Sequence, residues 1–182
     1  MKAREIEGAP RRGAMTEVPK KGGESMKRIE ELSKEEQDIV RDTTTYMGLV
    51  MAYRERYGDE SLEVLRSFGE KMGTKIGNEL KQKGIKGSGV EDLRKMNDLQ
   101  TEDFPDETFK YEVEANKLRI IREVPSLCPM ILVSKELNIP LRTICENLAF
   151  PQFRAIMKTV NPNVKHTCIE ISEQRCVHDL EI

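Results

Sequence analysis

Two stretches that alternate apolar and polar residues constrain the fold more than any other feature of this chain. The first is 109–121, FKYEVEANKLRII, and the second is 164–182, VKHTCIEISEQRCVHDLEI. Alternation with a period of two residues is typical of half-buried strands, and a short polar turn divides each stretch. Each stretch therefore predicts a β-hairpin.

The register of the first hairpin follows from its side chains. A two-residue turn at Ala115-Asn116 places Val113 opposite Leu118 and Glu112 opposite Arg119. The apolar pair then lies on one face of the hairpin and the ion pair lies on the other. The apolar pattern and the charge pairing therefore support the same register.

The segments around the two hairpins have helical periodicity. Two long amphipathic runs follow Ser33, which forms a capping box with Glu36, and the first run ends at Gly58. A second capping box, Ser88 with Glu91, predicts a short helix through residue 99. Between the hairpins lie three helical segments, each with a proline near its start. The order predicts an α+β fold, with helices packed on a four-stranded antiparallel sheet made of two separated β-hairpins.

Three glycines lie four residues apart within the second long helical run: Gly69, Gly73 and Gly77. Each glycine costs up to ~1 kcal/mol relative to alanine in a helix interior. The stripe predicts close approach of a neighbouring backbone, either from the same chain or from a second subunit, and a ligand lying on the stripe is the alternative.

Composition sets the remaining bounds. Residues 1–30 are rich in glycine, proline and charge and predict a flexible tail, followed by a single domain over 31–182. The net charge of −2 favours neither nucleic acid nor an anionic membrane as partner. The chain also lacks an apolar run of the ~20 residues that a bilayer requires, and its first residues lack an apolar signal region. A cytoplasmic location and reduced cysteines are the resulting expectations.

Two of the four cysteines lie in the helical segments. Cys128 precedes Pro129 and is expected at a helix N-cap, where the macrodipole favours a thiolate that attacks electrophiles or binds metal; burial as a small apolar residue is the alternative. Cys145 shares the apolar face of its helix with Leu141, Ile144 and Leu148, which favours core packing and keeps a ligand role open.

The other cysteines lie in the second hairpin. Cys176 and His178 share the inward, apolar face of the last strand. A two-residue turn at Glu173-Gln174 places Cys168 opposite Asp179 on the other face, whereas a three-residue loop would bring it to the side of Cys176. His166 changes sides together with Cys168.

The cysteine spacing is C-x16-C-x22-C-x7-C, without a CxxC pair, so it matches no local zinc-finger or ferredoxin pattern. A zinc or iron–sulfur site would have to be assembled by the fold. The separate positions of Cys128, Cys145 and Cys176 predict that they converge on one metal site. His178 is the expected fourth ligand or proton carrier, and Cys168 competes for that role, depending on the turn. The phosphate-binding, dinucleotide, hydrolase-elbow and zincin motifs are absent from the sequence.

The second half of the chain resembles the L-2-amino-thiazoline-4-carboxylic acid hydrolase family. The resemblance rests on VPSLCPM, TICENL, NPN and RCVHDLEI, with Cys128-Pro129, Cys145 and Cys176 at matching positions. SEQRC stands where many such hydrolases carry a Gly-Asp-x-x-Cys turn. The layout of hairpins and helices also resembles the 4-vinyl reductase domain, a small ligand-binding module.

The resemblance implies two functions, which the sequence leaves open. In the hydrolase, the Cys128 thiolate adds to the carbon of a cyclic C=N bond while His178 or His166 moves protons. In the alternative, the domain is a non-catalytic module that binds a metal or a small molecule. A homodimer is expected in either case.

Overall fold

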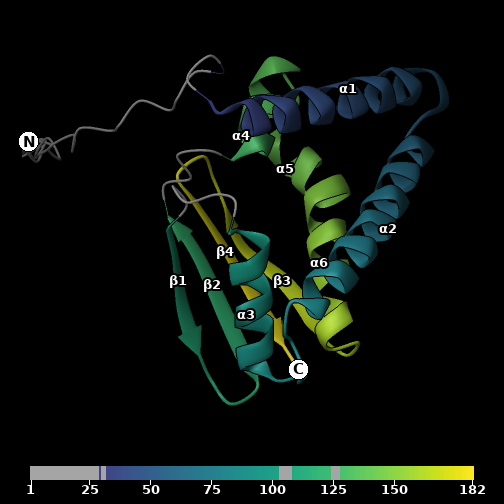
Figure 1. Ribbon diagram of the computed structural model, residues 1–182. Helices are drawn as coiled ribbons and strands as arrows, with labels where there is room; N and C mark the ends of the chain where they lie inside the picture. Colours follow the sequence, from purple (N-terminus) through teal and green to yellow (C-terminus); the bar gives the residue numbers. More distant parts are fainter. Residues whose placement is uncertain (1–28, 30–31, 103–107, 124–127) are drawn as a thin grey trace, which may run out of the picture.

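The computed structural model describes residue 29 and residues 32–102, 108–123 and 128–182. The tail predicted for residues 1–30 lies outside this part of the chain, apart from Ile29. The architecture is α+β, as the sequence predicts (Figure 1). The elements are α1 (Lys34–Tyr57), α2 (Glu60–Gln82), α3 (Val90–Gln100), β1 (Thr108–Val113), β2 (Lys117–Glu123), α4 (Pro129–Glu136), α5 (Leu141–Ile144), the π-helix η2 (Cys145–Ala149), α6 (Phe150–Val160), β3 (Lys165–Ile171) and β4 (Arg175–Glu181).

The four strands form one antiparallel sheet in the order β1-β2-β4-β3. The two hairpins meet through β2 and β4, where Leu118 pairs with Leu180. The first hairpin has the predicted register, since Val113 pairs with Leu118 and Glu112 with Arg119. The prediction of two hairpins in a shared sheet is therefore confirmed.

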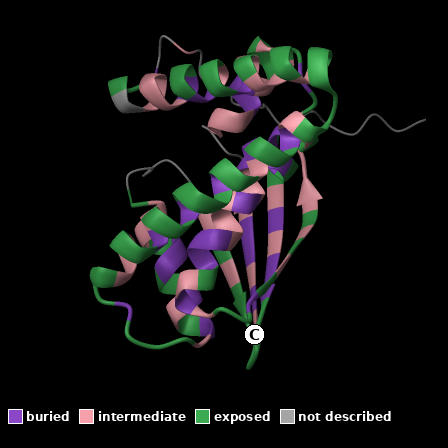
Figure 2. Cartoon of the chain, turned by 90° about the vertical axis from the view of Figure 1, so that its right-hand side faces the viewer, coloured by how far each residue is buried: buried purple, intermediate pink, exposed green. Residues whose placement is uncertain are grey.

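Helices α3 and α6 cover one face of the sheet, and α2 packs along the outside of α6 (Figure 1). The main core lies between them and contains Leu118, Ile120 and Leu180 from the sheet, Met96 from α3 and Ile156 from α6. Figure 2 shows buried segments, in purple, on the helices and on the strands that they cover. A second core joins α1, α2, α4 and α5 beyond the end of the sheet.

The glycine stripe of α2 is the surface on which α6 packs. A Cβ atom at Gly69 would lie 2.8 Å from the backbone oxygen of Leu148, and one at Gly73 would overlap the backbone oxygen of Gln152. At Gly77 it would lie 2.8 Å from the side chain of Thr159. The prediction that the stripe faces a closely packed helix is confirmed, and that helix belongs to the same chain.

The cap of α1 is confirmed. The Ser33 hydroxyl accepts a hydrogen bond from the backbone N–H of Glu36 (3.2 Å), and the Glu36 carboxylate accepts one from the backbone N–H of Ser33 (2.7 Å). The helix ends at Gly58, whose φ of 79° favours glycine.

The cap predicted for α3 is wrong by one residue. The helix begins after Gly89 rather than after Ser88. The Asp92 carboxylate accepts hydrogen bonds from the backbone N–H groups of both Gly87 and Gly89 (3.2 Å each). Two free donors are thereby satisfied by one side chain, which fixes the start of the helix there.

Two helical segments that the sequence shows separately are joined in the structure. Helix α5, η2 and α6 form one continuous helical run over 141–160. Pro151 lacks a backbone N–H and cannot continue an α-helical ladder into the preceding turn. The wider π-turn accommodates this loss, because the backbone N–H of Phe150 bonds the oxygen of Cys145.

The outer face of the sheet carries a network of ion pairs centred on Asp179. Its carboxylate accepts two hydrogen bonds from Arg119, one from Nε (2.7 Å) and one from Nη2 (2.9 Å), and a third from Nζ of Lys117 (2.7 Å). Only 6% of the Asp179 side chain is exposed. The hydrogen bond from Arg119 is the main reason that the pKa of Asp179 falls to about 2.

Candidate metal centre

A β-bulge in β3 determines which side chains share the inner face of the second hairpin. The turn at Glu173-Gln174 has two residues, since the backbone N–H of Ser172 bonds the oxygen of Arg175 (2.8 Å). The pairing nevertheless shifts by one residue between Cys168 and Glu170. Ile169 is the extra residue, and it is exposed.

The bulge places Cys168 opposite His178 instead of opposite Asp179. The sequence allows Cys168 to reach the inner face through a three-residue loop. In the structure the turn has two residues, and the bulge in β3 brings Cys168 to that face instead. The Cys168 thiol donates a hydrogen bond to the backbone oxygen of Glu170 (3.3 Å), which satisfies an acceptor inside the bulge. As a result, Cys168, Cys176 and His178 all point to the helical side of the sheet.

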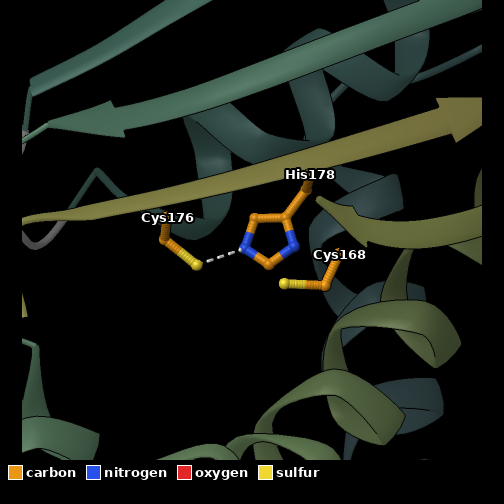
Figure 3. A group of neighbouring side chains, drawn as sticks. All are labelled: Cys168, Cys176 and His178. Atoms are coloured by element: carbon orange, nitrogen blue, oxygen red, sulfur yellow. Dashed lines mark hydrogen bonds between the residues drawn. The ribbon is translucent and has the colours of Figure 1, made fainter. Parts of the chain in front are cut away.

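These three residues form a compact set of candidate ligands (Figure 3). Their Sγ and imidazole nitrogen atoms all lie within 4.8 Å of one another, and each residue is half-buried. Sγ of Cys176 lies 2.9 Å from Nε2 of His178. A tetrahedral zinc ion with Zn–S bonds of ~2.3 Å holds its ligand atoms ~4 Å apart, so the set matches that spacing after small side-chain movements.

The second nitrogen of His178 is held by another histidine. Nδ1 of His178 lies 2.9 Å from Nε2 of His166 on β3. Burial is the main cause that lowers the pKa of His166 to about 3 and that of His178 to about 4, so both rings are neutral near pH 7. When Nδ1–H of His178 donates to His166, its Nε2 presents a lone pair to the thiols.

Two aromatic rings enclose the histidine pair. Phe150 and Phe153 of α6 contact both imidazoles, with ring centroids 5.1–5.5 Å apart. Three of these four contacts are edge-on, and Phe153 is tilted against His178. The rings limit the movement of the imidazoles and cover part of their surface.

The thiols of the site favour the protonated form. Burial raises the pKa of Cys176 to about 12, and the neighbouring thiols of Cys168 and Cys128 add to this effect. Burial also raises the pKa of Cys168. Arg122, which pairs with Cys176 across β2 and β4, acts in the opposite direction. Thiolates therefore form here when a cation replaces their protons.

Cys128 occupies the predicted N-cap of α4, with its backbone oxygen accepting from the N–H of Ile131 (2.9 Å). Its side chain lines a cavity of about 200 Å³ together with His178, Arg122 and Phe153. A second cavity of about 400 Å³ is lined by Cys168 and His166. Residues of the site thus line two cavities.

Cys145 is buried, as its place on the apolar helix face predicts. Burial raises its pKa, and Cys128, Cys176 and Cys168 raise it further, so the four cysteines share one electrostatic neighbourhood. Within the described residues, however, the compact ligand set contains Cys168, Cys176 and His178, and it includes neither Cys128 nor Cys145. The sequence leaves Cys168 open as an alternative to His178 in this site, and it gives His166 only a proton-carrying role.

Two comparisons with known proteins gave no relative. No protein-family model matches the chain, and no curated protein gives a significant match. Among the described helices, none is long and apolar enough to cross a membrane. The site geometry is therefore the basis for any functional conclusion.

Proposed function

We propose that this chain is a metal-binding module that holds a zinc ion with Cys168, Cys176 and His178. The observation that carries the proposal is the compact set of two thiols and an imidazole on the inner face of one hairpin. The second nitrogen of that imidazole is held by His166. A partner of this kind fixes the ring and its tautomer in many metal sites.

The ligand types favour zinc. Thiolate and imidazole together suit Zn²⁺, whereas Mg²⁺ and Ca²⁺ prefer oxygen ligands. An iron–sulfur cluster usually needs four cysteine ligands, and two of the four thiols lie outside the compact set. Three protein ligands leave a fourth position for water or a small molecule, which is the arrangement of reactive zinc sites.

A hydrolase that uses Cys128 is the second candidate. It is favoured by one observation, namely that Cys128 and His178 line the same cavity of about 200 Å³. It also agrees with the resemblance of the second half to thiazoline-carboxylic acid hydrolases. We prefer the metal site to the hydrolase because the two nitrogens of His178 are directed to Cys176 and His166.

Metal analysis of protein purified without oxygen tests the proposal. We expect about one zinc per chain, and its loss in the Cys168→Ser and Cys176→Ser variants. Cys145→Ala is the matched control, because it removes a neighbouring thiol outside the ligand set. Protein that contains no zinc and takes up none when Zn²⁺ is added would contradict the proposal.

Alkylation separates the second candidate from the first. A nucleophilic Cys128 reacts quickly with iodoacetamide near neutral pH, whether or not zinc is bound. Slow reaction at Cys128, followed by mass spectrometry of the peptides, would exclude the hydrolase mechanism. Fast reaction in a zinc-free protein would favour it over the metal site.

A further inference from the structure

The outer side of α1 carries a largely exposed stripe of apolar and aromatic side chains, of which Tyr46 also contacts the ring of Phe68 on α2 (ring centroids 5.7 Å apart). Tyr46, Leu49, Tyr53 and Tyr57 are 46–59% exposed, although each is large and apolar or aromatic. They recur at steps of three and four residues, so they form one line along the helix. The opposite side of α1 is used by the chain itself, since Val40 and Met47 belong to the second core.

The stripe has a simple charge pattern about its centre. Asp42 lies seven residues before Leu49 and Arg56 lies seven residues after it, and both are exposed on the same side of the helix. Seven residues are two helical turns, or about 10.5 Å. A carboxylate and a guanidinium therefore stand at equal distances from Leu49, with opposite sign.

Large and small side chains on this side of α1 are also paired about Leu49. Tyr46 and Ala52 lie three residues on either side of Leu49, and Thr45 and Tyr53 lie four residues on either side. A two-fold axis at Leu49 sets Tyr46 of one helix opposite Ala52 of the other and Tyr53 opposite Thr45, while Tyr57 lies opposite Arg41. Such an arrangement packs two helices closely, because large residues fill the spaces beside small ones.

We propose that α1 pairs with α1 of a second copy of this chain, antiparallel and about a two-fold axis at Leu49. Asp42 of each copy then lies beside Arg56 of the other, which gives two symmetric ion pairs at the ends of the apolar contact. A self-complementary surface of this kind is what a two-fold dimer requires. Tyrosine is also enriched at the centres of protein interfaces.

The contacts that Asp42 and Arg56 make within the chain are local. Among the described residues, Asp42 is bound by its neighbour Arg41, and Arg56 lies over the ring of its neighbour Tyr57. Both side chains are solvent-exposed and such exposed contacts contribute little to stability, so neither residue is needed for the fold. The glycine stripe of α2 is separate from this surface, because α6 of the same chain covers it.

Sedimentation of the full chain over about a hundredfold range of concentration tests the dimer. We expect a monomer–dimer equilibrium in the parent protein and a monomer in Leu49→Glu, which places two carboxylates at the axis. Leu49 is 59% exposed, so circular dichroism should show an unchanged fold. A parent protein that is monomeric throughout, or a dimer unaffected by Leu49→Glu, would overturn the proposal.

A charge exchange tests the antiparallel direction. Asp42→Arg and Arg56→Asp each place like charges together at both ends, and we expect each to raise the dissociation constant about tenfold. The double variant restores both pairs with reversed sign and should recover the parent value. Glu79→Arg, on an exposed part of α2, is the matched control. A double variant that is as weak as the single ones would rule out the antiparallel pairing.

Discussion

Nε2 of His166 and Nδ1 of His178 lie 2.9 Å apart, on neighbouring strands and beneath two phenylalanine rings. Both rings are neutral near pH 7, and a hydrogen bond at this distance needs one N–H and one lone pair, so one proton lies between the two nitrogens. This contact sets the direction in which Nε2 of His178 points, and so it connects the fold of the hairpin to the proposed metal site.

His166→Phe should weaken zinc binding without removing a ligand. The loss of the partner of Nδ1 leaves the His178 ring less well oriented, and we expect a loss of affinity of about 10–100-fold. Competition with a coloured chelator measures the change. His166→Gln, which still offers an acceptor, should lose less, and a His166→Phe protein that binds zinc as tightly as the parent would show that the contact has no part in binding.

Zinc binding should strengthen steeply with pH. Cys168 and Cys176 both have raised pKa values and carry protons near neutral pH, so binding releases two protons. His178 releases none above pH 5, because its pKa is about 4. The apparent affinity should therefore rise about 100-fold per pH unit between about pH 6 and 8. Calorimetry in buffers of different ionisation enthalpy counts the protons, and a count near zero would contradict the ligand assignment.

Gly73→Ala should destabilise the protein by about 1–3 kcal/mol, because the added methyl group overlaps the backbone of α6. Gly73→Leu should cost more. Gly48→Ala is the matched control on α1, since its Cβ would meet Leu137 only at 3.9 Å. That change should raise the free energy of unfolding by ~0.5–1 kcal/mol. Urea unfolding measures both, and equal stability of the Gly73→Ala and parent proteins would contradict the close packing of α2 on α6.

Asp179→Asn should lower stability at neutral pH by about 1–3 kcal/mol, because the carboxylate is buried and bound by Arg119 and Lys117. The folded-state pKa of about 2 lies below the ordinary value of 3.8. The contribution is therefore complete above about pH 4 and is lost as the pH falls towards about 2.

The difference in unfolding free energy between Asp179→Asn and the parent should disappear over that range of pH. Asp38→Asn, which breaks an exposed pair with Arg41, should cost less than ~1 kcal/mol at any pH. A difference between the Asp179→Asn and parent proteins that stays constant down to about pH 2 would show that the charge of Asp179 is not what stabilises the sheet.

Much of the fold follows from local patterns in the sequence. The alternation of 109–121 determines the register of the first hairpin, because a slip of one residue would place Leu118 and Ile120 on the charged face. The glycine stripe likewise predicts a close helix contact, although the sequence does not say that the partner is α6. The sequence does not predict the joining of α5 and α6, because a proline at this position is equally consistent with the start of a new helix.

The candidate site was only partly predictable. Cys176 and His178 are two residues apart on one strand, so their common face follows from strand geometry alone. The position of Cys168 depends on a bulge, which alternation does not encode. The position of His166 depends on the same bulge, because His166 lies on the same face of β3 as Cys168. The contact between the two histidines could not be inferred without the register across β3 and β4.

The bulge at Ile169 also determines which changes in chain length this hairpin tolerates. β3 contains one residue more than the opposite part of β4, and Ile169 is the residue without a partner. A deletion of Ile169 would leave a regular ladder in which Cys168 still faces His178. An insertion elsewhere in β3, between Cys168 and the turn, would move Cys168 and His166 to the outer face unless a second bulge formed. Loss of one residue here is therefore compatible with the site, whereas gain of one residue is not.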